Sequence, residues 1–550
     1  MHFHEDPYPS KICKLVMRLN RNIILFLSAL MIISSSAVAF AALIGQGKKI
    51  LYIPIDNRPI ILPQTVDVAE KLGYEVVVPP DEILGSHNAF GDPDKLWDWL
   101  NENAAGVDAA VISTDAMLYG SLVASRQHNL TAEEIMTRAK KFEQFKAKFP
   151  NLPIYAFGTV MRTPRMGSSL AHEPEYYATY GSQIFRYTAL KDKAEIEKLT
   201  RKETKELEQL EKNIPKEYLD DWFQRRANNF NALKYFADLT QNYIFDYFLF
   251  GCDDSAEYSQ THAEGRHLED YTKPLGKARC QVISGADELG ILMLSRAVNK
   301  NIGEIPLVAV RYNVGKGAYT FPRYGNEIIS KSVDDAILAS GSFRINNADR
   351  ADFIVAVNTN YDGKTMEANL PGNFTTPRKG TKPFVKILKD LTEKNYSVGV
   401  VDVAYGNGAD NALMDQMRLN DLLFKIRAYG GWNTASNTSG FLIGEGVLLR
   451  WMNNSDVEEL LLTRYLDDWV YQANVRRVVT DMLPKMSGEG SKGALDEKIS
   501  HVDKLTSEMA TKFVAENIKL PQGFLLRNIL YTHPWNRMYE AGVHFELVEE

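Results

Sequence analysis

The sequence has 550 residues, of which 45% are hydrophobic and 24% charged, with a formal net charge of -7. These are ordinary values for a globular protein, and the length exceeds what one hydrophobic core usually organises. The negative charge argues against nucleic acid or an anionic bilayer as partner. We therefore expect a small-molecule or glycan ligand and no membrane contact beyond the N-terminal segment, and the oligomeric state stays open.

The N-terminal segment predicts export. A basic stretch at 17–22 precedes an apolar run at 23–42, which ends in the small-residue pattern Ala-Phe-Ala-Ala. This arrangement is typical of a cleavable signal peptide, so residues 1–42 are expected to be removed, with residues 1–16 an over-extended start. The mature protein is then periplasmic, cell-surface or extracellular. An uncleaved anchor is the alternative, because the run is just long enough to span a bilayer.

Two cysteines, Cys252 and Cys280, follow this segment. Each lies near an apolar run that is typical of a strand, which predicts a buried thiol. A disulfide between them is the alternative.

Short β-branched or aromatic runs alternate with amphipathic stretches along the chain. This alternation predicts an α/β fold with mainly parallel strands and flanking helices, because the runs are continuously apolar rather than alternating. The expected strands are 50–55, 75–78, 109–113, 154–160, 243–250, 280–284, 307–310, 353–357 and 398–401. They form either two Rossmann-like units that share a cleft or one barrel-like unit. Nine strands exceed the eight of a simple barrel, which favours two units.

The predicted organisation has three parts after the signal segment. A first α/β unit covers 48–300, a second covers 301–432, and a helical C-terminal section covers 433–550. The first unit contains a charged helical insertion at about 173–241, which is either a solvated hairpin or a lid over the cleft.

Polar residues gather where the predicted strands end. Open α/β sheets and barrels both place their ligand sites at these carboxyl ends. An aspartate there is often only the cap of the next helix, which explains one acid but not the pairs Asp253-Asp254 and Asp287-Glu288. Adjacent buried acids need a cation, an arginine or a shared proton. We expect a polar cleft, with an ion-pair network as the alternative. The residues expected in this cleft are Asp56, Arg58, Asp115, Arg126, Arg162, Asp253, Asp254, Asp287, Glu288, Arg311 and Asp402.

Two later segments carry further candidates. The stretch 405–410, with Asn407 and Asp410, follows a strand and predicts an anion-binding nest or a tight turn. The stretch 430–438, with Trp432, Asn433 and Asn437, sets an aromatic ring beside amides, which suits a sugar. The motifs of zinc proteases, serine-hydrolase elbows and Cys-x-x-Cys pairs do not occur. No cofactor and no metal-ligand set is expected, and a divalent cation stays open.

Several of these motifs together resemble the bacterial family catalogued as Domain of Unknown Function 4127. They are the segments 52–59, 115–126, 285–288, 407–410 and 431–438, and the resemblance extends from Lys49 to Arg537. It implies an exported protein and no mechanism. The family pattern usually has Leu-Asp-Asp-Arg-Pro where this chain has Ile-Asp-Asn-Arg-Pro, and Asn57 cannot act as an acid or base. It also has Gly-Leu where this chain has Gly120-Ser121.

The favoured function is a hydrolase that acts on a glycan or glycoconjugate. Glu288 is the expected general acid, Asp287 orients the substrate, and Asp253 and Asp254 assist. The expected substrate contacts are Asp56, Arg58, Asp115, Arg126, Arg162, Asp402, Asn407, Asp410, Trp432, Asn433 and Asn437. The alternatives are a noncatalytic envelope solute-binding protein and a divalent-metal-dependent phosphoesterase.

Overall fold

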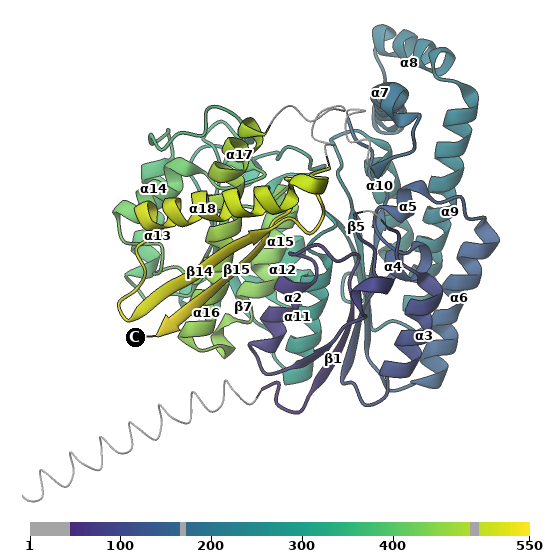
Figure 1. The fold of residues 1–550 in the computed structure, drawn as a ribbon. Helices are drawn as coiled ribbons and strands as arrows, with labels where there is room; N and C mark the ends of the chain where they lie inside the picture. Colours follow the sequence, from purple (N-terminus) through teal and green to yellow (C-terminus); the bar gives the residue numbers. More distant parts are fainter. Residues whose placement is uncertain (1–43, 88, 166–171, 484–493, 550) are drawn as a thin grey trace, which may run out of the picture.

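The computed structural model describes residues 44–87, 89–165, 172–483 and 494–549. Two parallel sheets are packed together through a shared layer of helices (Figure 1). The segment 1–42, which the sequence assigns to a signal peptide, lies outside the described residues. Among the described helices, none is both long enough and apolar enough to cross a membrane.

The first sheet has six parallel strands in the order β2-β1-β3-β4-β5-β6. The central strands β3, β4 and β5 are buried along their whole length, as their continuous apolar runs predict. The strands are β1 (Lys49–Ile53), β2 (Glu75–Val77), β3 (Ala109–Ser113), β4 (Ile154–Val160), β5 (Tyr247–Cys252) and β6 (Cys280–Ser284).

Helices cover both faces of this sheet. One face packs against α3, α6 and α9 through a core that includes Trp97, Phe142 and Phe236. The helix α6 begins at a capping box between Thr131 and Glu134. The helices of this unit are α2 (Pro63–Glu70), α3 (Pro93–Asn103), α4 (Thr114–Tyr119), α5 (Ala124–Gln127), α6 (Ala132–Lys148), α7 (Tyr177–Ile196), α8 (Arg201–Asn213), α9 (Lys216–Gln241), α10 (Gln260–Thr272) and α11 (Leu289–Ile302).

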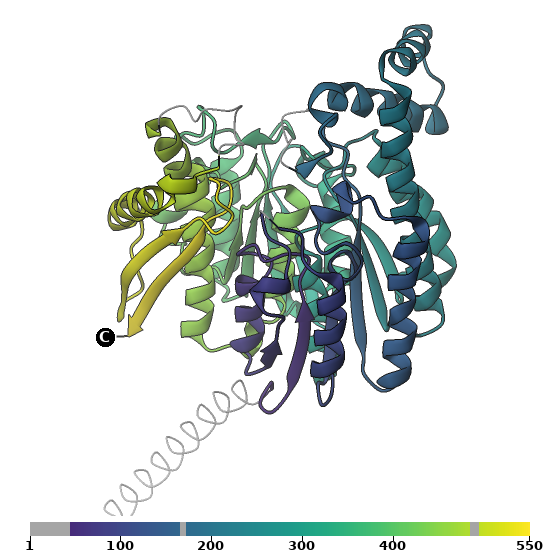
Figure 2. The ribbon, with the colours of Figure 1, turned by 45° about the vertical axis from the view of Figure 1, so that its right-hand side comes forward.

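The charged stretch at 173–241 forms α7, α8 and α9. The first two extend from the body as an arm, and α8 has no buried residue. Both ribbon views place this arm far from the C-terminal hairpin described below (Figure 2). The third helix, α9, packs against α6, β4 and β5, so only part of the insertion is solvated.

The second sheet has five parallel strands in the order β13-β11-β9-β7-β8. Its strands are β7 (Leu307–Tyr312), β8 (Phe343–Ile345), β9 (Phe353–Asn358), β11 (Val398–Asp402) and β13 (Ala428–Gly430). Its helices are α12 (Ile329–Ala339), α13 (Thr381–Thr392), α14 (Asn411–Leu419) and α15 (Ala435–Gly446), and β10 (Met366–Glu367) pairs with β12 (Tyr405–Gly406) outside the sheet.

The two sheets share one winding pattern. In each, the chain starts on an inner strand, moves to an edge strand on one side, and then crosses to the other side. The crossing creates a switch point, between β1 and β3 in the first sheet and between β7 and β9 in the second, and open α/β sheets bind ligands outside such points. Both sheets are open, so the expectation of two Rossmann-like units is confirmed and the barrel-like alternative is wrong.

The helices α11, α12 and α15 lie between the sheets (Figure 1). One core joins residues of both units, among them Tyr52, Ile291 and Phe353. A glycine on α15 allows this close approach, because a Cβ on Gly444 would lie 2.9 Å from the Ile291 side chain of α11. The two units therefore bury their apolar faces against the same helical layer.

The C-terminal section is helical only in part. It contains α16 (Asn454–Arg464), a π-helical segment (Tyr465–Val475), α17 (Arg476–Met482) and α18 (Ile499–Asn517), followed by the antiparallel pair β14 (Phe524–Thr532) and β15 (Gly542–Glu549). The expected helical section contains these helices, but the expectation did not include the hairpin. Its signal was the alternating pattern of Val-His-Phe-Glu-Leu in β15, which has the period of a half-buried strand.

Cys252 and Cys280 are buried free thiols, which confirms the buried-thiol prediction and not the disulfide. Cys252 lies opposite Ser284 and Cys280 opposite Phe248, so the cysteines lie at opposite ends of the β5–β6 pair. Burial raises the pKa of Cys252 to about 12 and that of Cys280 to about 11.

A buried acid on α15 gives the first prediction. Glu445 is 2% exposed, and its Oε1 has no hydrogen-bond partner among the described residues. Burial raises its pKa from 4.5 to about 8, although the nearby Arg464 charge opposes this. In the folded chain Glu445 stays protonated up to about pH 8, whereas in the unfolded chain it ionises near pH 4.5. A rise in pH between these values therefore favours the unfolded chain and lowers the free energy of unfolding. Glu445 alone should contribute a loss of about 1.4 kcal/mol per pH unit across this interval.

The Glu445→Gln variant should lack this contribution. The difference in free energy of unfolding between the variant and the native chain should therefore increase with pH, in favour of the variant. Guanidinium chloride unfolding at about pH 5 and about pH 7.5 measures the difference. The exposed Glu393→Gln variant is the control. A Glu445→Gln variant with the native pH slope would contradict the prediction.

Candidate functional site

A polar cavity of about 290 Å³ lies at the carboxyl ends of the first sheet's strands. Loops after β1, β2, β3, β4, β5 and β6 all contribute to it, together with α15 and the C-terminal section. Its lining consists of Asp56, Arg58, His87, Leu122, Val123, Arg126, Arg162, His172, Asp253, Asp254, Asp287, Asn433, Asn437, Trp535, Arg537, Tyr539 and Glu540. The cavity includes the switch point between β1 and β3, as expected for this topology.

Arg58 is the central cation at one end of the cavity. Its Nε donates to both carboxylate oxygens of Asp56, and its Nη2 donates to Asp287 Oδ1 at 2.7 Å. Its guanidinium also lies 5.5 Å from the centre of the Trp535 ring. Burial lowers the pKa of Arg58, but the charges of Asp287 and Asp56 outweigh burial and raise it overall. The guanidinium therefore stays charged and fixes both carboxylates.

The second unit completes this end of the site through α15 and the loop before it. Asn433 Nδ2 donates to Asp287 Oδ2 at 2.8 Å, and Asn437 Nδ2 donates to the same oxygen at 3.3 Å. Asn437 also accepts from the backbone amides of Ala286 and Asp287. Burial raises the pKa of Asp287 although Arg58 opposes this. Both oxygens of Asp287 are thus held in place by groups from two units.

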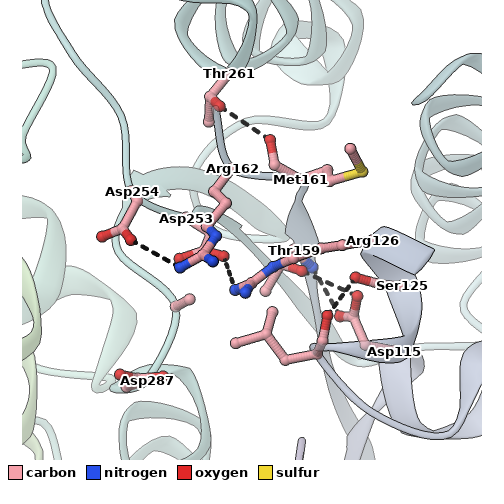
Figure 3. A network of polar contacts seen from close by, with 12 residues as sticks. Asp115, Ser125, Arg126, Thr159, Met161, Arg162, Asp253, Asp254, Thr261 and Asp287 are labelled. Atoms are coloured by element: carbon pink, nitrogen blue, oxygen red, sulfur yellow. Dashed lines mark hydrogen bonds and ion pairs between the residues drawn. The ribbon is translucent and has the colours of Figure 1, made fainter. Parts of the chain in front are cut away.

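The acidic pair after β5 is bound by two arginines of the cavity lining (Figure 3). Arg126 Nη2 donates to Asp253 at 2.5 Å, and Arg162 Nη1 donates to Asp254 at 3.3 Å. Arg162 Nε also donates to Glu173 at 2.6 Å. Of the four arginines expected near the acids, Arg58, Arg126 and Arg162 contact them and Arg311 does not, so part of the predicted cluster is an ion-pair network.

Asp254 differs from the other cavity carboxylates in exposure and in backbone. Its side chain is 36% exposed, whereas those of Asp56, Asp253, Asp287 and Glu540 are 10% exposed or less. Its φ is +23°, in the region that favours glycine, and such strain concentrates at functional sites. Although the side chain is open to the cavity, desolvation by the surrounding protein and the Asp253 charge raise the pKa of Asp254 to about 6, and Arg162 opposes this. Asp254 is thus a reachable carboxyl that carries a proton at mildly acidic pH.

Two predicted acids lie outside the cavity lining. Glu288 is 1% exposed and packs under α15, where a Cβ on Gly440 would lie 2.4 Å from its Cγ. Burial holds the pKa of Glu288 well above its usual value. Asp115 is 3% exposed and accepts from the backbone amide and the hydroxyl of Thr159, behind Arg126 in Figure 3. Burial raises the pKa of Asp115 to about 7.

The candidates of the second sheet form a separate network. Asp402 accepts from Asn358, Tyr429 and the Asp410 amide, and Asp410 is paired with Arg378. Both acids are fully buried at the end of the second sheet and do not line the cavity. Arg311, at the end of β7, also lies outside the lining.

Asn407 and Trp432 support the cavity from outside. Asn407 accepts from the Tyr539 hydroxyl at 2.7 Å, and the Trp432 ring centre lies 6.1 Å from that of Tyr539. Because Trp432 is 3% exposed, its ring contacts protein.

The segment 533–540 covers the cavity, and the sequence indicated its part 533–537 but not Tyr539 and Glu540. Trp535 Nε1 donates to Asn57 Oδ1 at 2.9 Å, and the Tyr539 hydroxyl donates to Asn433 at 2.9 Å. This cover segment is therefore fixed to both units. The aromatic-and-amide pattern Pro-Trp-Asn-Arg was its signal in the sequence.

Two histidines in the cavity were also missed. Arg537 Nη1 donates to His172 Nε2 at 2.8 Å, so this nitrogen is an acceptor and the imidazole is neutral. Burial and the charges of Arg162 and Arg537 lower the pKa of His172. His87 packs edge-on against His172 and Trp535. Within the described ranges, no three His, Cys, Asp or Glu side chains are grouped so that they could hold a metal ion.

The paired sheets define an α/β protein of Rossmann-like units with a polar cavity at the strand ends. A family model described as a protein of unknown function, DUF4127, matches residues 50–544, and the chain belongs to this family. This match confirms the resemblance seen in the sequence motifs. Among the curated proteins, none matches the chain.

Proposed function

We propose that this protein is a hydrolase of a glycan or glycoconjugate, with Asp254 as the general acid. The observation that carries the proposal is the combination at Asp254 of access to the cavity and a pKa of about 6. Cleavage of a glycosidic bond requires a carboxylic acid that protonates the departing oxygen, and such acids have raised pKa values. The acid role thus moves from Glu288, which lies beneath the cavity, to Asp254.

The second carboxylate of the proposed reaction is Asp253. It takes a proton from the attacking water while Asp254 gives its proton to the oxygen of the bond that breaks. Arg126 holds Asp253 in position. Asp287 orients the substrate indirectly, because it fixes the positions of Arg58 and Asn433 in the lining.

The composition of the lining supports a sugar as ligand. Leu122 and Val123 supply apolar surface, while the arginines and amides supply many hydrogen-bonding groups. A sugar ring likewise has apolar faces and a polar edge. The proposed setting is outside the cytoplasm, on the basis of the N-terminal segment that predicts a signal peptide.

The test is turnover by the chain begun near Lys48 on a panel of chromogenic glycosides and cell-wall fragments. We expect release of chromophore or reducing ends from at least one substrate. Ligand binding without any release would contradict the hydrolase and support a noncatalytic solute-binding protein.

The pH profile should identify Asp254 as an acid rather than a base. Because the reacting form is protonated, kcat/KM should fall about tenfold per pH unit above about pH 6. Initial rates between about pH 4 and about pH 8 at constant ionic strength measure the profile. A rate that rises through pH 6 would contradict the assignment, because the ionised carboxylate would then be the active form.

A further inference from the structure

Arg126, beside the acidic pair, has a hydrogen-bond donor without an acceptor in the described part of the protein. Arg126 is 4% exposed, and its Nη2 contacts Asp253. Its Nε is buried and has no acceptor among the described residues. A buried charged donor without an acceptor is unfavourable, so the geometry indicates that a ligand supplies one.

Three arginines of the lining lie near the neutral His172, and each is paired with at least one carboxylate. They are Arg126, Arg162 and Arg537. Burial and their charges lower the pKa of His172. Guanidinium groups that face one cavity offer charge-assisted hydrogen bonds to an anionic group that enters it.

We propose that Arg126 and Arg162 form a subsite for a carboxylate of the substrate, so that the glycan contains an acidic sugar of the uronic acid type. This inference rests on the proposed hydrolase function. Guanidinium groups bind planar carboxylates with charge-assisted hydrogen bonds that are stronger than neutral ones. A doubly charged phosphate is disfavoured because Asp253, Asp254 and Glu173 lie beside the two arginines and would repel it more strongly.

The subsite would also act on the proposed acid. A carboxylate that binds Arg162 takes part of the positive charge that now faces Asp254. A second negative charge nearby favours protonation of a carboxyl group. The acidic substrate therefore helps to keep Asp254 in the form that donates a proton.

The first test needs no variant. Isothermal titration of the native chain compares D-glucuronic acid and D-galacturonic acid with their methyl esters, which have the same rings without the charge. At least one acid should bind roughly tenfold more tightly than its ester, the effect of a charge-assisted hydrogen bond. Equal affinities, no binding of either acid, or tighter binding of glucose 6-phosphate would each overturn the carboxylate subsite.

The second test removes the donor. The Arg126→Met variant should lower the acid-to-ester affinity ratio to about one, and Arg126→Lys should retain part of it because it keeps the charge but not the Nε. The control is Arg344→Met, outside the cavity on β8. An unchanged ratio in a folded Arg126→Met chain would overturn the proposal. If this variant does not fold, the ester comparison on the native chain decides.

The outcomes separate this inference from the proposed function. Turnover of glycosides by the native chain, together with equal affinities for the acidic sugars and their methyl esters, would leave the hydrolase and overturn the subsite. Preferential binding of acidic sugars without turnover of any glycan would leave the subsite and overturn the hydrolase.

Discussion

Replacement of Asp254 by asparagine should lower kcat/KM by roughly 10²- to 10⁴-fold, the usual contribution of a general acid. Asparagine has the same size and can still accept from Arg162, but it has no proton to donate. Because the Asp254 side chain is 36% exposed, the change should leave the fold intact. Initial rates measure the effect, and thermal unfolding of the same samples verifies the fold.

Two comparison variants sharpen this result. Asp362→Asn changes an exposed carboxylate outside the cavity, and it should have native rates. Glu288→Gln tests the acid that the sequence favoured. Turnover that is lost in Glu288→Gln and kept in Asp254→Asn would return the acid role to Glu288.

Replacement of Arg58 by methionine should lower the free energy of unfolding by about 3–5 kcal/mol, the range for a broken buried ion pair. Asp56 and Asp287 are 1% and 7% exposed, and both would lose the cation between them. Guanidinium chloride unfolding measures the loss.

The matched control for Arg58 is Arg344→Met. This arginine pairs with an exposed aspartate at the surface, so its loss should cost only about 0–1 kcal/mol. A similarly small change in Arg58→Met would show that the two carboxylates do not depend on Arg58 for their burial.

The long strands of both sheets could be predicted from the sequence, because each is a continuous apolar run. The predicted 154–160 and 353–357 agree with β4 and β9 within one residue. The strands β8 and β13 were missed because each has only three residues and pairs through contacts with a neighbouring strand. Such short strands depend on tertiary pairing more than on local preference.

The site could be predicted in part for a geometric reason. Parallel strands bring their carboxyl ends to one edge, so Asp56, Arg126, Arg162, Asp253 and Asp287 meet as expected. The sequence could not show how the two units are arranged, and it therefore placed Asp402 and Asp410 in the same site. It also could not decide which acid of a pair faces the cavity, because the local loop directs Glu288 toward α15 and Asp287 toward Arg58.

The contacts of the cover segment could not be predicted from the sequence, because they join residues that are distant along the chain. Trp535 and Asn57 are 478 residues apart, and no local pattern connects them. Sequence periodicity indicates only which face of its own helix or strand a residue occupies.

The cover segment has a consequence for the timing of cavity formation during translation. The ribosome makes the first sheet early, with its acids and arginines, but Trp535, Arg537 and Tyr539 emerge only after both sheets have been synthesised. Until then, the acids at the strand ends are more exposed to water. The burial that raises the pKa of a carboxyl group is then incomplete. A nascent or shortened chain therefore has the residues of the site without their enclosed environment.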